Sequence, residues 1–120
     1  MTPSPRLRLR IVFGPDAMLG PGKADLLDLI AETGSIAAAA KRMGMSYKRA
    51  WTLVEQMNAA FRTPLVVSTR GGPKGGGAQV SPTGVQVLGA YRRIEGRLAD
   101  LGAAELTEIG SLLRDMSDGK

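Results

Sequence analysis

The sequence predicts one mainly α-helical domain with a small β-sheet, and three observations lead to that prediction. Apolar residues recur with a helical period over residues 23–61 and again after residue 82. Between these regions lie two short strand-like segments that are joined by a stretch rich in glycine. The 120 residues contain no internal repeat and fit a single compact domain. We therefore expect a single domain over residues 1–120 in which helices dominate.

The composition excludes several classes of protein. The chain has no cysteine, which excludes disulfides and thiolate metal sites, and no histidine, the commonest general base and metal ligand. With no paired carboxylates in a plausible cleft, we expect no enzyme, no metal site and no cofactor. No apolar run approaches the roughly 18 residues of a membrane span, and the start lacks a signal-peptide pattern. We expect a cytoplasmic protein without membrane contact, and the formal charge of +5 favours a polyanionic partner.

The first third of the chain predicts a strand, a loop and a helix. Residues 6–13 alternate between basic and apolar side chains, which is typical of a half-buried strand. The glycines and prolines between Gly14 and Gly22 predict a loop, and residues 23–33 have a helical period that ends at Gly34. The expected inward residues are Leu7, Leu9, Ile11 and Phe13 of the strand and Leu26, Leu29, Ile30 and Thr33 of the helix.

Residues 35–61 predict two helices joined by a tight turn. Ser35 and Ser46 are each suited to cap a helix, over residues 36–43 and 47–61, and Gly44 lies in the turn between them. The small residues Ala39 and Ala40 allow the helices to cross closely, as a helix-turn-helix requires. The expected inward stripe of the second helix is Tyr47, Ala50, Trp51, Val54, Met57 and Phe61. This stripe places Trp51 in the core, the alternative being a platform on which bases stack.

The outward side of the second helix predicts contact with DNA. Lys48, Arg49 and Thr52 lie near its start, and residues 35–79 contain seven basic side chains and one acidic side chain. Lys and Arg bind guanine edges in the major groove, and hydroxyl groups bind bases or phosphates. The Tyr47 hydroxyl is expected to reach a phosphate. The alternative is a solvated basic helix face, which leaves the turn and the two caps unexplained.

Residues 65–81 predict a β-hairpin of the kind called a wing. The expected strands are residues 65–69 and 79–80, and the glycine-rich segment between them is expected to be irregular. It does not match a phosphate-binding P-loop, because Lys74 lies among the glycines and a second strand follows in place of a helix. We expect the basic side chains and glycines of this segment to lie along the DNA backbone, the alternative being an unstructured loop.

From Ser81 and Pro82 onward the sequence predicts a long helix, over about residues 82–116, that serves dimerisation. Its apolar residues follow a heptad spacing, whose phase changes near Gly102. The alternative is that this face packs on the domain's own core, and one helix can do both. The expected dimer-interface residues are Val87, Tyr91, Ile94, Leu98 and Leu101.

Several of these segments are similar to known regulators. Residues 34–46 resemble the helix-turn-helix opening of LysR-type regulators. The run Ser46-Tyr47-Lys48 with Ala50-Trp51, residues 55–58, and the wing at residues 71–78 resemble the DNA-binding domain of molybdate-responsive ModE regulators. The resemblance implies a dimeric winged helix that binds operator DNA. Full-length ModE members also carry a C-terminal pair of small β-barrels that bind molybdate. No strands follow the expected dimerisation helix, so we expect no molybdate site in this chain.

The sequence thus predicts a dimeric winged helix-turn-helix protein, with the helix-turn-helix at residues 35–61, the wing at 65–81 and the dimerisation helix at about 82–116. We expect a homodimeric, sequence-specific regulator of transcription that binds double-stranded DNA. The alternatives are a non-specific architectural DNA-binding protein and a winged-helix adaptor that binds another protein. The expected DNA contacts are Ser35, Ser46, Tyr47, Lys48, Arg49, Thr52, Arg70, Lys74, Gly75 and Gly76.

Overall fold

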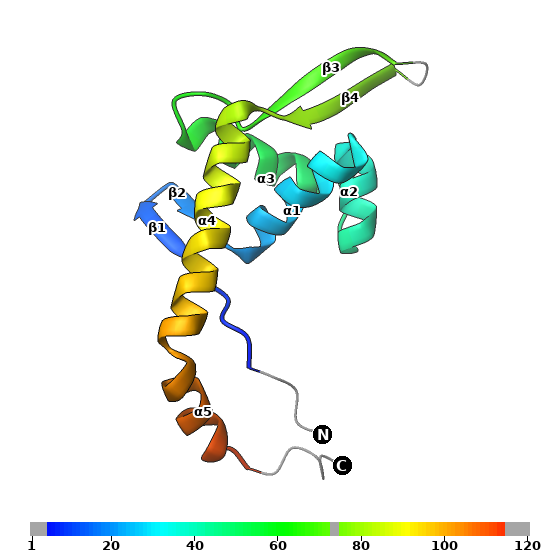
Figure 1. Cartoon of the computed structure of the whole chain (residues 1–120). Helices are drawn as coiled ribbons and strands as arrows, with labels where there is room; N and C mark the ends of the chain where they lie inside the picture. The colour runs from blue at the N-terminus through cyan, green and yellow to red at the C-terminus, as the bar shows by residue number, and fades with distance from the viewer. Residues whose placement is uncertain (1–4, 73–74, 115–120) are drawn as a thin grey trace.

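The computed structural model describes residues 5–72 and 75–114, and it confirms a mainly α-helical winged helix-turn-helix. The helices α1 to α3 form a cluster, α4 runs along one side of it, and the hairpin β3–β4 and the helix α5 lie at opposite ends (Figure 1). The elements are β1 (Ile11–Gly14), β2 (Ala17–Leu19), α1 (Pro21–Thr33), α2 (Ile36–Met43), α3 (Tyr47–Ala60), β3 (Val66–Gly72), β4 (Gly75–Val80), α4 (Pro82–Leu101) and α5 (Ala103–Ser111).

The core lies between α1, α2, α3 and the first half of α4. Leucine and isoleucine of α1 lie in this core with Ala39 and Ala40 of α2 and Ala50 of α3, so small residues are buried where the two helix-turn-helix helices were predicted to cross. Among the residues expected to point inward from α1, Leu29 and Thr33 are only half-buried, whereas Leu27 is fully buried. The largest fully buried side chains are those of Leu26, Leu27, Ile30, Met57, Leu65 and Tyr91.

The predicted helix ends are confirmed at the helix-turn-helix. Gly34 and Gly44 have φ angles of 71° and 72°, a left-handed conformation that glycine adopts without steric cost. The hydroxyl oxygen of Ser35 accepts from the amide of Ala38 at 3.0 Å, and that of Ser46 accepts from the amide of Arg49 at 3.1 Å. These local contacts begin α2 and α3 at the predicted residues.

The N-terminal strand differs from the prediction. Only residues 11–14 are a strand, and they pair with β2, which lies in the segment predicted as a loop. Pairing of Ile11 with Leu19 closes a short antiparallel hairpin around Pro15-Asp16. The expected inward face is also divided: Leu9 and Ile11 pack on the core, but Leu7 is 39% exposed and Phe13 is 57% exposed, in a T-shaped arrangement with the Phe61 ring. A strand needs a partner along its length, and residues 6–10 have none in the described part of the chain.

The wing strands are longer than predicted, because part of the glycine-rich segment joins the sheet. Val66 pairs with Val80 at the base, and Gly72 pairs with Gly75 near the tip. Backbone hydrogen bonds form without side chains, so glycine lowers strand propensity but does not prevent pairing. At the base, the Ala78 amide donates to the Gly34 carbonyl at 3.0 Å, and a Cβ at Gly77 would lie 3.0 Å from that same oxygen.

The Asn58 side chain, on α3, forms hydrogen bonds with the backbone at the start of the first wing strand. Its Oδ1 accepts from the amides of Leu65 at 2.8 Å and Val66 at 3.1 Å, and its Nδ2 donates to the Val66 carbonyl at 3.0 Å. One amide side chain therefore satisfies three backbone groups where the chain leaves α3 for the wing. The position of the wing relative to α3 is held by these three hydrogen bonds.

The C-terminal region contains two helices in place of the single helix predicted for about residues 82–116. Gly102 ends α4 and begins α5, at the position where the apolar stripe changes phase. The last residues of the predicted range, 115 and 116, lie outside the described residues. Glycine stabilises a helix poorly, and here it divides one. Within the described part of the chain, no helix has the length and apolar character needed to cross a membrane.

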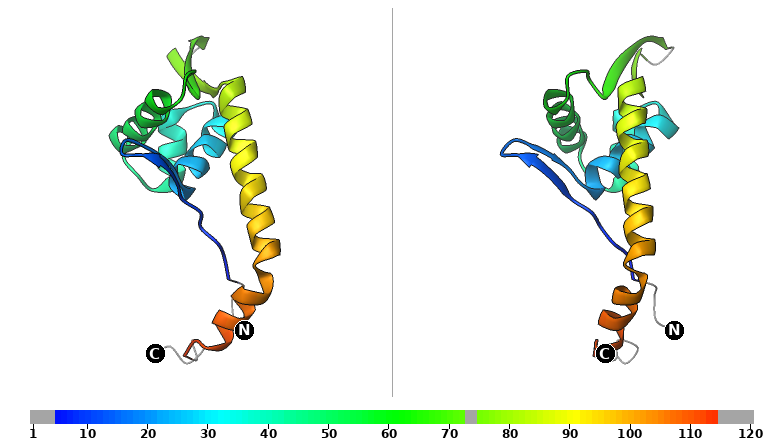
Figure 2. Two further views of the ribbon diagram at one scale, coloured as in Figure 1. Left: turned by 90° about the vertical axis from the view of Figure 1, so that its left-hand side faces the viewer. Right: turned by 60° about the vertical axis from the view of Figure 1, so that its left-hand side comes forward.

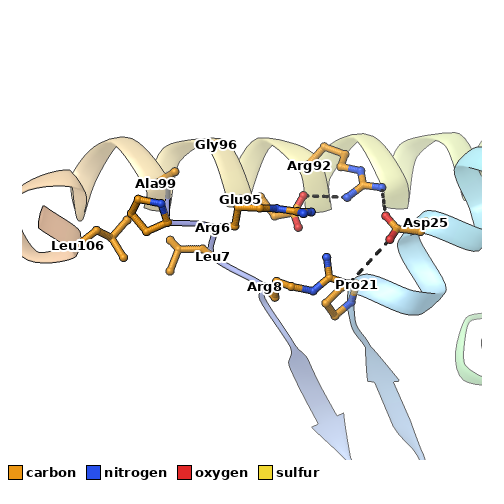
Figure 3. Close-up of a pocket in the computed structure, with 11 residues that line it drawn as sticks. Arg6, Leu7, Arg8, Pro21, Asp25, Arg92, Glu95, Gly96, Ala99 and Leu106 are labelled. Atoms are coloured by element: carbon orange, nitrogen blue, oxygen red, sulfur yellow. Dashed lines mark hydrogen bonds and ion pairs between the residues drawn. The ribbon is translucent and has the colours of Figure 1, made fainter. Parts of the chain in front are cut away.

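Arg92 forms ion pairs that connect α4 to α1 (Figure 3). Its guanidinium donates to Asp25 at 2.9 Å and to Asp28 on α1, and to Glu95 on its own helix at 3.0 Å. Burial alone would lower the pKa of Arg92, but the hydrogen bonds that its guanidinium donates to the three carboxylates outweigh burial, and the pKa is raised above its ordinary value. Arg8 of the N-terminal segment approaches Asp25 at 4.0 Å.

Substitution of Gly84 by alanine is expected to lower the free energy of unfolding by about 1–3 kcal/mol. A Cβ at this position would lie 2.5 Å from Val80 Cγ1 and even closer to the Leu65 carbonyl oxygen, so α4 would have to move away from the wing base. Denaturant unfolding of the two proteins measures the effect. The matched control is Gly96→Ala on the same helix, where a Cβ meets open space and the helix gains up to about 1 kcal/mol. Equal unfolding free energies for Gly84→Ala and wild type would contradict the close packing.

Candidate nucleic-acid interface

The outer face of α3 carries the polar residues predicted to contact DNA. Lys48, Arg49 and Thr52 are exposed, while Ala50, Val54 and Met57 of the same helix are buried in the core. The Thr52 hydroxyl donates to the Lys48 carbonyl at 2.9 Å and keeps its oxygen as an acceptor. Packing on one face therefore presents the other face, with both cations near the start of the helix, to solvent.

Lys48 and Arg49 are not neutralised by acidic neighbours. Within residues 5–72 and 75–114, the ion pairs formed by Arg8, Arg42 and Arg92 do not involve either side chain. Arg42 at the end of α2 behaves differently, because it pairs with Glu32 of α1. Unpaired cations on an exposed helix face remain available to a polyanion.

Ser35 and Ser46 have structural roles that the structure shows directly. Both hydroxyl oxygens are occupied as helix caps, and the Ser35 amide donates to the Thr33 hydroxyl at 3.2 Å. The caps place the amino ends of α2 and α3 on one side of the molecule, where positive helix dipoles favour anions. Contact of either serine with DNA remains a prediction.

The aromatic residues of α3 correct the sequence-based prediction. Trp51 was expected in the core and Tyr47 on the inward stripe, but their side chains are 47% and 55% exposed. They lie one turn apart beside a hollow of about 260 Å³ that opens between the start of α2 and the base of the wing. Ala50 and Val54 face the core directly, whereas Trp51 lies at the edge of the stripe, where no element packs over it. The other lining residues are Ser35, Ile36, Ala37, Ser68, Gly77 and Ala78.

Trp51 is the exposed residue of this candidate interface that the sequence-based prediction placed in the core. Its position in the helical period is 100° from Ala50, which places it on the flank of the apolar stripe and not at its centre. A large aromatic residue at such a flank, four residues after another aromatic, was the available signal. The structure places both rings beside the same hollow, on the side of α3 that faces the base of the wing.

The wing projects from the helical cluster beyond the start of α4 (Figure 2). Arg70, Gly75 and Gly76 lie within its strands, so these predicted contacts belong to regular structure and not to an irregular loop. Lys74, the other predicted contact, lies outside the described residues. The wing base adjoins the first residues of α2 and α3, so the helix-turn-helix and the wing form one continuous surface.

The predicted dimer seam divides into two parts along α4. Val87 packs against the core and Tyr91 is buried in it, with its hydroxyl donating to the Leu9 carbonyl. The dimer-interface prediction is therefore wrong for Tyr91, which has no accessible surface left for a partner. Ile94 and Leu98 are each 38% exposed, and Leu101 is 81% exposed. The exposed apolar surface continues onto α5 and the residues after it, through Ile109, Leu112 and Leu113.

A hollow of about 410 Å³ lies beside this seam, between the N-terminal segment, α4 and α5 (Figure 3). Ala99 and Leu106 form its apolar end, and Arg92 with its carboxylates forms its polar end. Arg8, Asp25, Arg92 and Glu95 of this hollow already form ion pairs with one another.

A family model describing bacterial regulatory helix-turn-helix proteins of the lysR family matches residues 23–84. The chain belongs to this lysR family. The match spans α1, the helix-turn-helix, the wing and the start of α4. The family consists of regulatory proteins and not enzymes, as the composition predicted.

Relatives of this lysR-family chain include two proteins named for molybdenum and one named as a transcriptional regulator. The molybdenum-pterin-binding protein MopB of Rhodobacter capsulatus is 44% identical over 85 residues, which cover 71% of this chain and 32% of the relative. The molybdenum transport protein ModE of Herbaspirillum seropedicae is 37% identical over 98 residues, covering 77% and 36%. The DNA-binding transcriptional dual regulator ModE of Escherichia coli is 39% identical over 71 residues, covering 59% and 27%.

These matches confirm the resemblance to ModE that the residues of α3 and the wing predicted. The chain spans about a third of the length of the relatives it matches. What those relatives bind is a property of the whole relatives, so the comparison with them supports the DNA-binding fold and carries no ligand over to this chain.

Proposed function

We propose that this chain is a sequence-specific transcriptional regulator that binds double-stranded DNA as a homodimer. The observation that carries the proposal is the exposed, unpaired basic start of α3, which lies between two capped helix ends and the wing. The lysR-family match and the ModE relatives support it.

In this proposal α3 enters the major groove, which is about 12 Å wide and admits one helix. Lys48 and Arg49 bind base edges, Thr52 binds a base or a phosphate, and Tyr47 reaches a phosphate with its hydroxyl. The amino end of α2, capped by Ser35, points at the backbone as a helix end suited to anions. Arg70, Lys74 and the wing glycines follow the backbone beside the groove.

The exposed end of the seam supplies the dimer contact. Ile94, Leu98 and Leu101 lie on α4 beyond the part of the helix that the core covers. A two-fold axis at this contact would fix the distance between the two α3 helices of the dimer. Helix-turn-helix dimers use such a fixed distance to bind half-sites about 34–36 Å apart. DNA binding of this kind needs no cofactor in this chain.

The test is selection of bound duplexes from a random library by the purified chain, at about 150 mM salt, with and without molybdate. A palindromic consensus with half-sites about one duplex turn apart is the expected result. Strong binding without a consensus would favour an architectural protein, which neutralises phosphates whatever the sequence. No enrichment at all would overturn DNA binding and favour a protein-binding adaptor.

Replacement of Trp51 by alanine is expected to weaken DNA binding by roughly threefold to tenfold, because the exposed ring offers apolar contact to a thymine methyl group or a sugar. The unfolding free energy should fall by only about 1–2 kcal/mol, since a fully buried tryptophan costs about 3–5 kcal/mol on truncation. Fluorescence anisotropy with the selected duplex and denaturant unfolding measure the two effects. If the unfolding free energy fell by about 3–5 kcal/mol and the DNA affinity were unchanged, Trp51 would have a purely structural role.

A further inference from the structure

A second hollow lies on the flank of α3 opposite to Trp51 and the wing. It has a volume of about 400 Å³ and opens between the β1–β2 hairpin, the first turn of α1 and α3. Arg10 just before β1, Lys23 of α1 and Arg49 of α3 line it, and none of its lining residues is acidic. We call this hollow the hairpin pocket. Arg10 and Arg49 are more than 35 positions apart in the sequence, and folding brings both of them to one place with Lys23.

Lys23 has an unusual environment for a lysine. It is only 7% exposed, and its Nζ donates to the Met18 carbonyl at 3.0 Å, which uses one of its three donors. Within the described residues no carboxylate forms an ion pair with Lys23, Arg10 or Arg49. Burial, and then the charge of Arg10, lowers the pKa of Lys23 below its ordinary value. A buried cation beside another cation is costly unless an anion joins them.

The first turn of α1 adds backbone donors to the same pocket. Its capping residue is Gly20, which offers no side-chain cap, and Pro21 has no amide hydrogen. The amides of Gly22 and Lys23 therefore have no side-chain partner at this helix end, and both residues line the pocket. Arg10 lies over the helix start, with its Cγ 3.8 Å from the position of a Cβ built on Gly20. The absence of a side chain at Gly20 leaves this approach open.

We propose that the hairpin pocket binds a phosphate group, and that in the DNA complex this is a backbone phosphate beside the major groove. This inference rests on the proposed function, because it places a second backbone contact on the side of α3 away from the wing. Arg49 lies at the border between the pocket and the exposed face of α3, so a phosphate held by Arg10 and Lys23 lies next to the groove that α3 enters. The same chemistry would accept free inorganic phosphate.

The first experiment uses Arg10→Gln in the full chain and measures the salt dependence of DNA binding. Each neutralised phosphate contributes about 0.9 to the slope of log Kobs against log salt, which corresponds to about fivefold in affinity between 1 M and about 0.15 M salt. Arg10→Gln is expected to lower the slope by about 0.9 for each chain bound. The matched control is Arg97→Gln, which removes the same charge from an exposed position on α4 and is expected to leave the slope unchanged.

The second experiment locates the phosphate, with duplexes that carry one neutral methylphosphonate at successive backbone positions. Wild type is expected to lose about fivefold in affinity at one position in each half-site, and Arg10→Gln should show no further loss at that position. Lys23→Met serves as a second variant, with denaturant unfolding to establish that it folds. Equal slopes and equal methylphosphonate profiles for wild type and Arg10→Gln would overturn the DNA contact.

Titration with inorganic phosphate, followed by the backbone amide signals of Gly22 and Lys23, distinguishes the two sources of the group. Shifts that are present in wild type and absent in Arg10→Gln, together with unchanged DNA slopes, would assign the pocket to a free phosphate. If phosphate caused no amide shift and Arg10→Gln left DNA binding unchanged, phosphate binding by the hairpin pocket would be overturned, even if wild type binds DNA. If wild type bound no DNA, the proposed function would fail, and the phosphate titration alone would decide for or against the pocket.

Discussion

Replacement of Lys48 by alanine is expected to weaken binding of the selected duplex by about 2–6 kcal/mol. A side chain that contacts a base edge contributes about 1–3 kcal/mol, and a dimer on a palindromic site makes the contact twice. Lys48 is exposed at the centre of the outward face of α3 and has no acidic partner among the residues described. Its removal leaves the helix fold intact, because its side chain does not pack in the core. Arg49→Ala is expected to act in the same range.

The measurement is anisotropy with the selected duplex and with duplexes changed at one pair of symmetric positions. Lys48→Ala should lose discrimination at the position that Lys48 contacts and keep it elsewhere. Arg97→Ala provides the control for loss of one charge at a position remote from α3. A uniform loss on all duplexes would make Lys48 a phosphate contact and move sequence discrimination to its neighbours on α3.

Replacement of Leu98 and Leu101 together by aspartate is expected to convert the dimer into monomers and to lower affinity for a full palindromic site by at least about a hundredfold. A dimer that contacts two half-sites at once binds roughly 10²–10⁴ times more tightly than a single half-site contact does, and a monomer loses this gain. Leu101 is 81% exposed, so a charged side chain there affects the folding of a single chain little. Leu98 is 38% exposed and also borders Leu7 and Leu9, so denaturant unfolding of the double variant measures the cost at that position. In a dimer they would bring four carboxylates into an apolar contact.

Sedimentation equilibrium gives the oligomeric state, and binding to full-site and half-site duplexes gives the affinity. The double variant should bind the half-site duplex as wild type does, since its α3 and wing are unchanged. Val85→Asp is the control for the oligomeric state, because Val85 is exposed on α4 but lies away from the seam. A double variant that remains dimeric would rule out this seam and leave the exposed leucines of the C-terminal region, Leu112 and Leu113, as the next candidates.

The sequence by itself determined the helix-turn-helix, because the interactions that delimit it are local. Ser35 and Ser46 cap helices through amides three residues later, and Gly34 and Gly44 adopt positive φ angles that other residues avoid. Such features depend on a few neighbouring residues, so α2 began and ended at the predicted residues and α3 began where predicted. The lysR-family match also rests on residues from this region.

The tertiary structure alone decided which apolar residues are covered, because burial depends on what packs against each face. The helical period placed Trp51 and Ala50 on one stripe, but only Ala50 has another element over it. Tyr91 satisfies the heptad spacing equally well as a core or a dimer residue, and contact with the N-terminal segment buries it within its own chain.

The same reason explains the strand β2, the glycine strands of the wing and the hairpin pocket. A strand forms where a partner chain segment supplies backbone hydrogen bonds, so β2 and the wing glycines required the folded hairpins. Arg10, Lys23 and Arg49 are single basic residues in three unrelated local patterns. Only the packing of the β1–β2 hairpin against α1 and α3 brings their charges together, because charge acts through space and not along the chain.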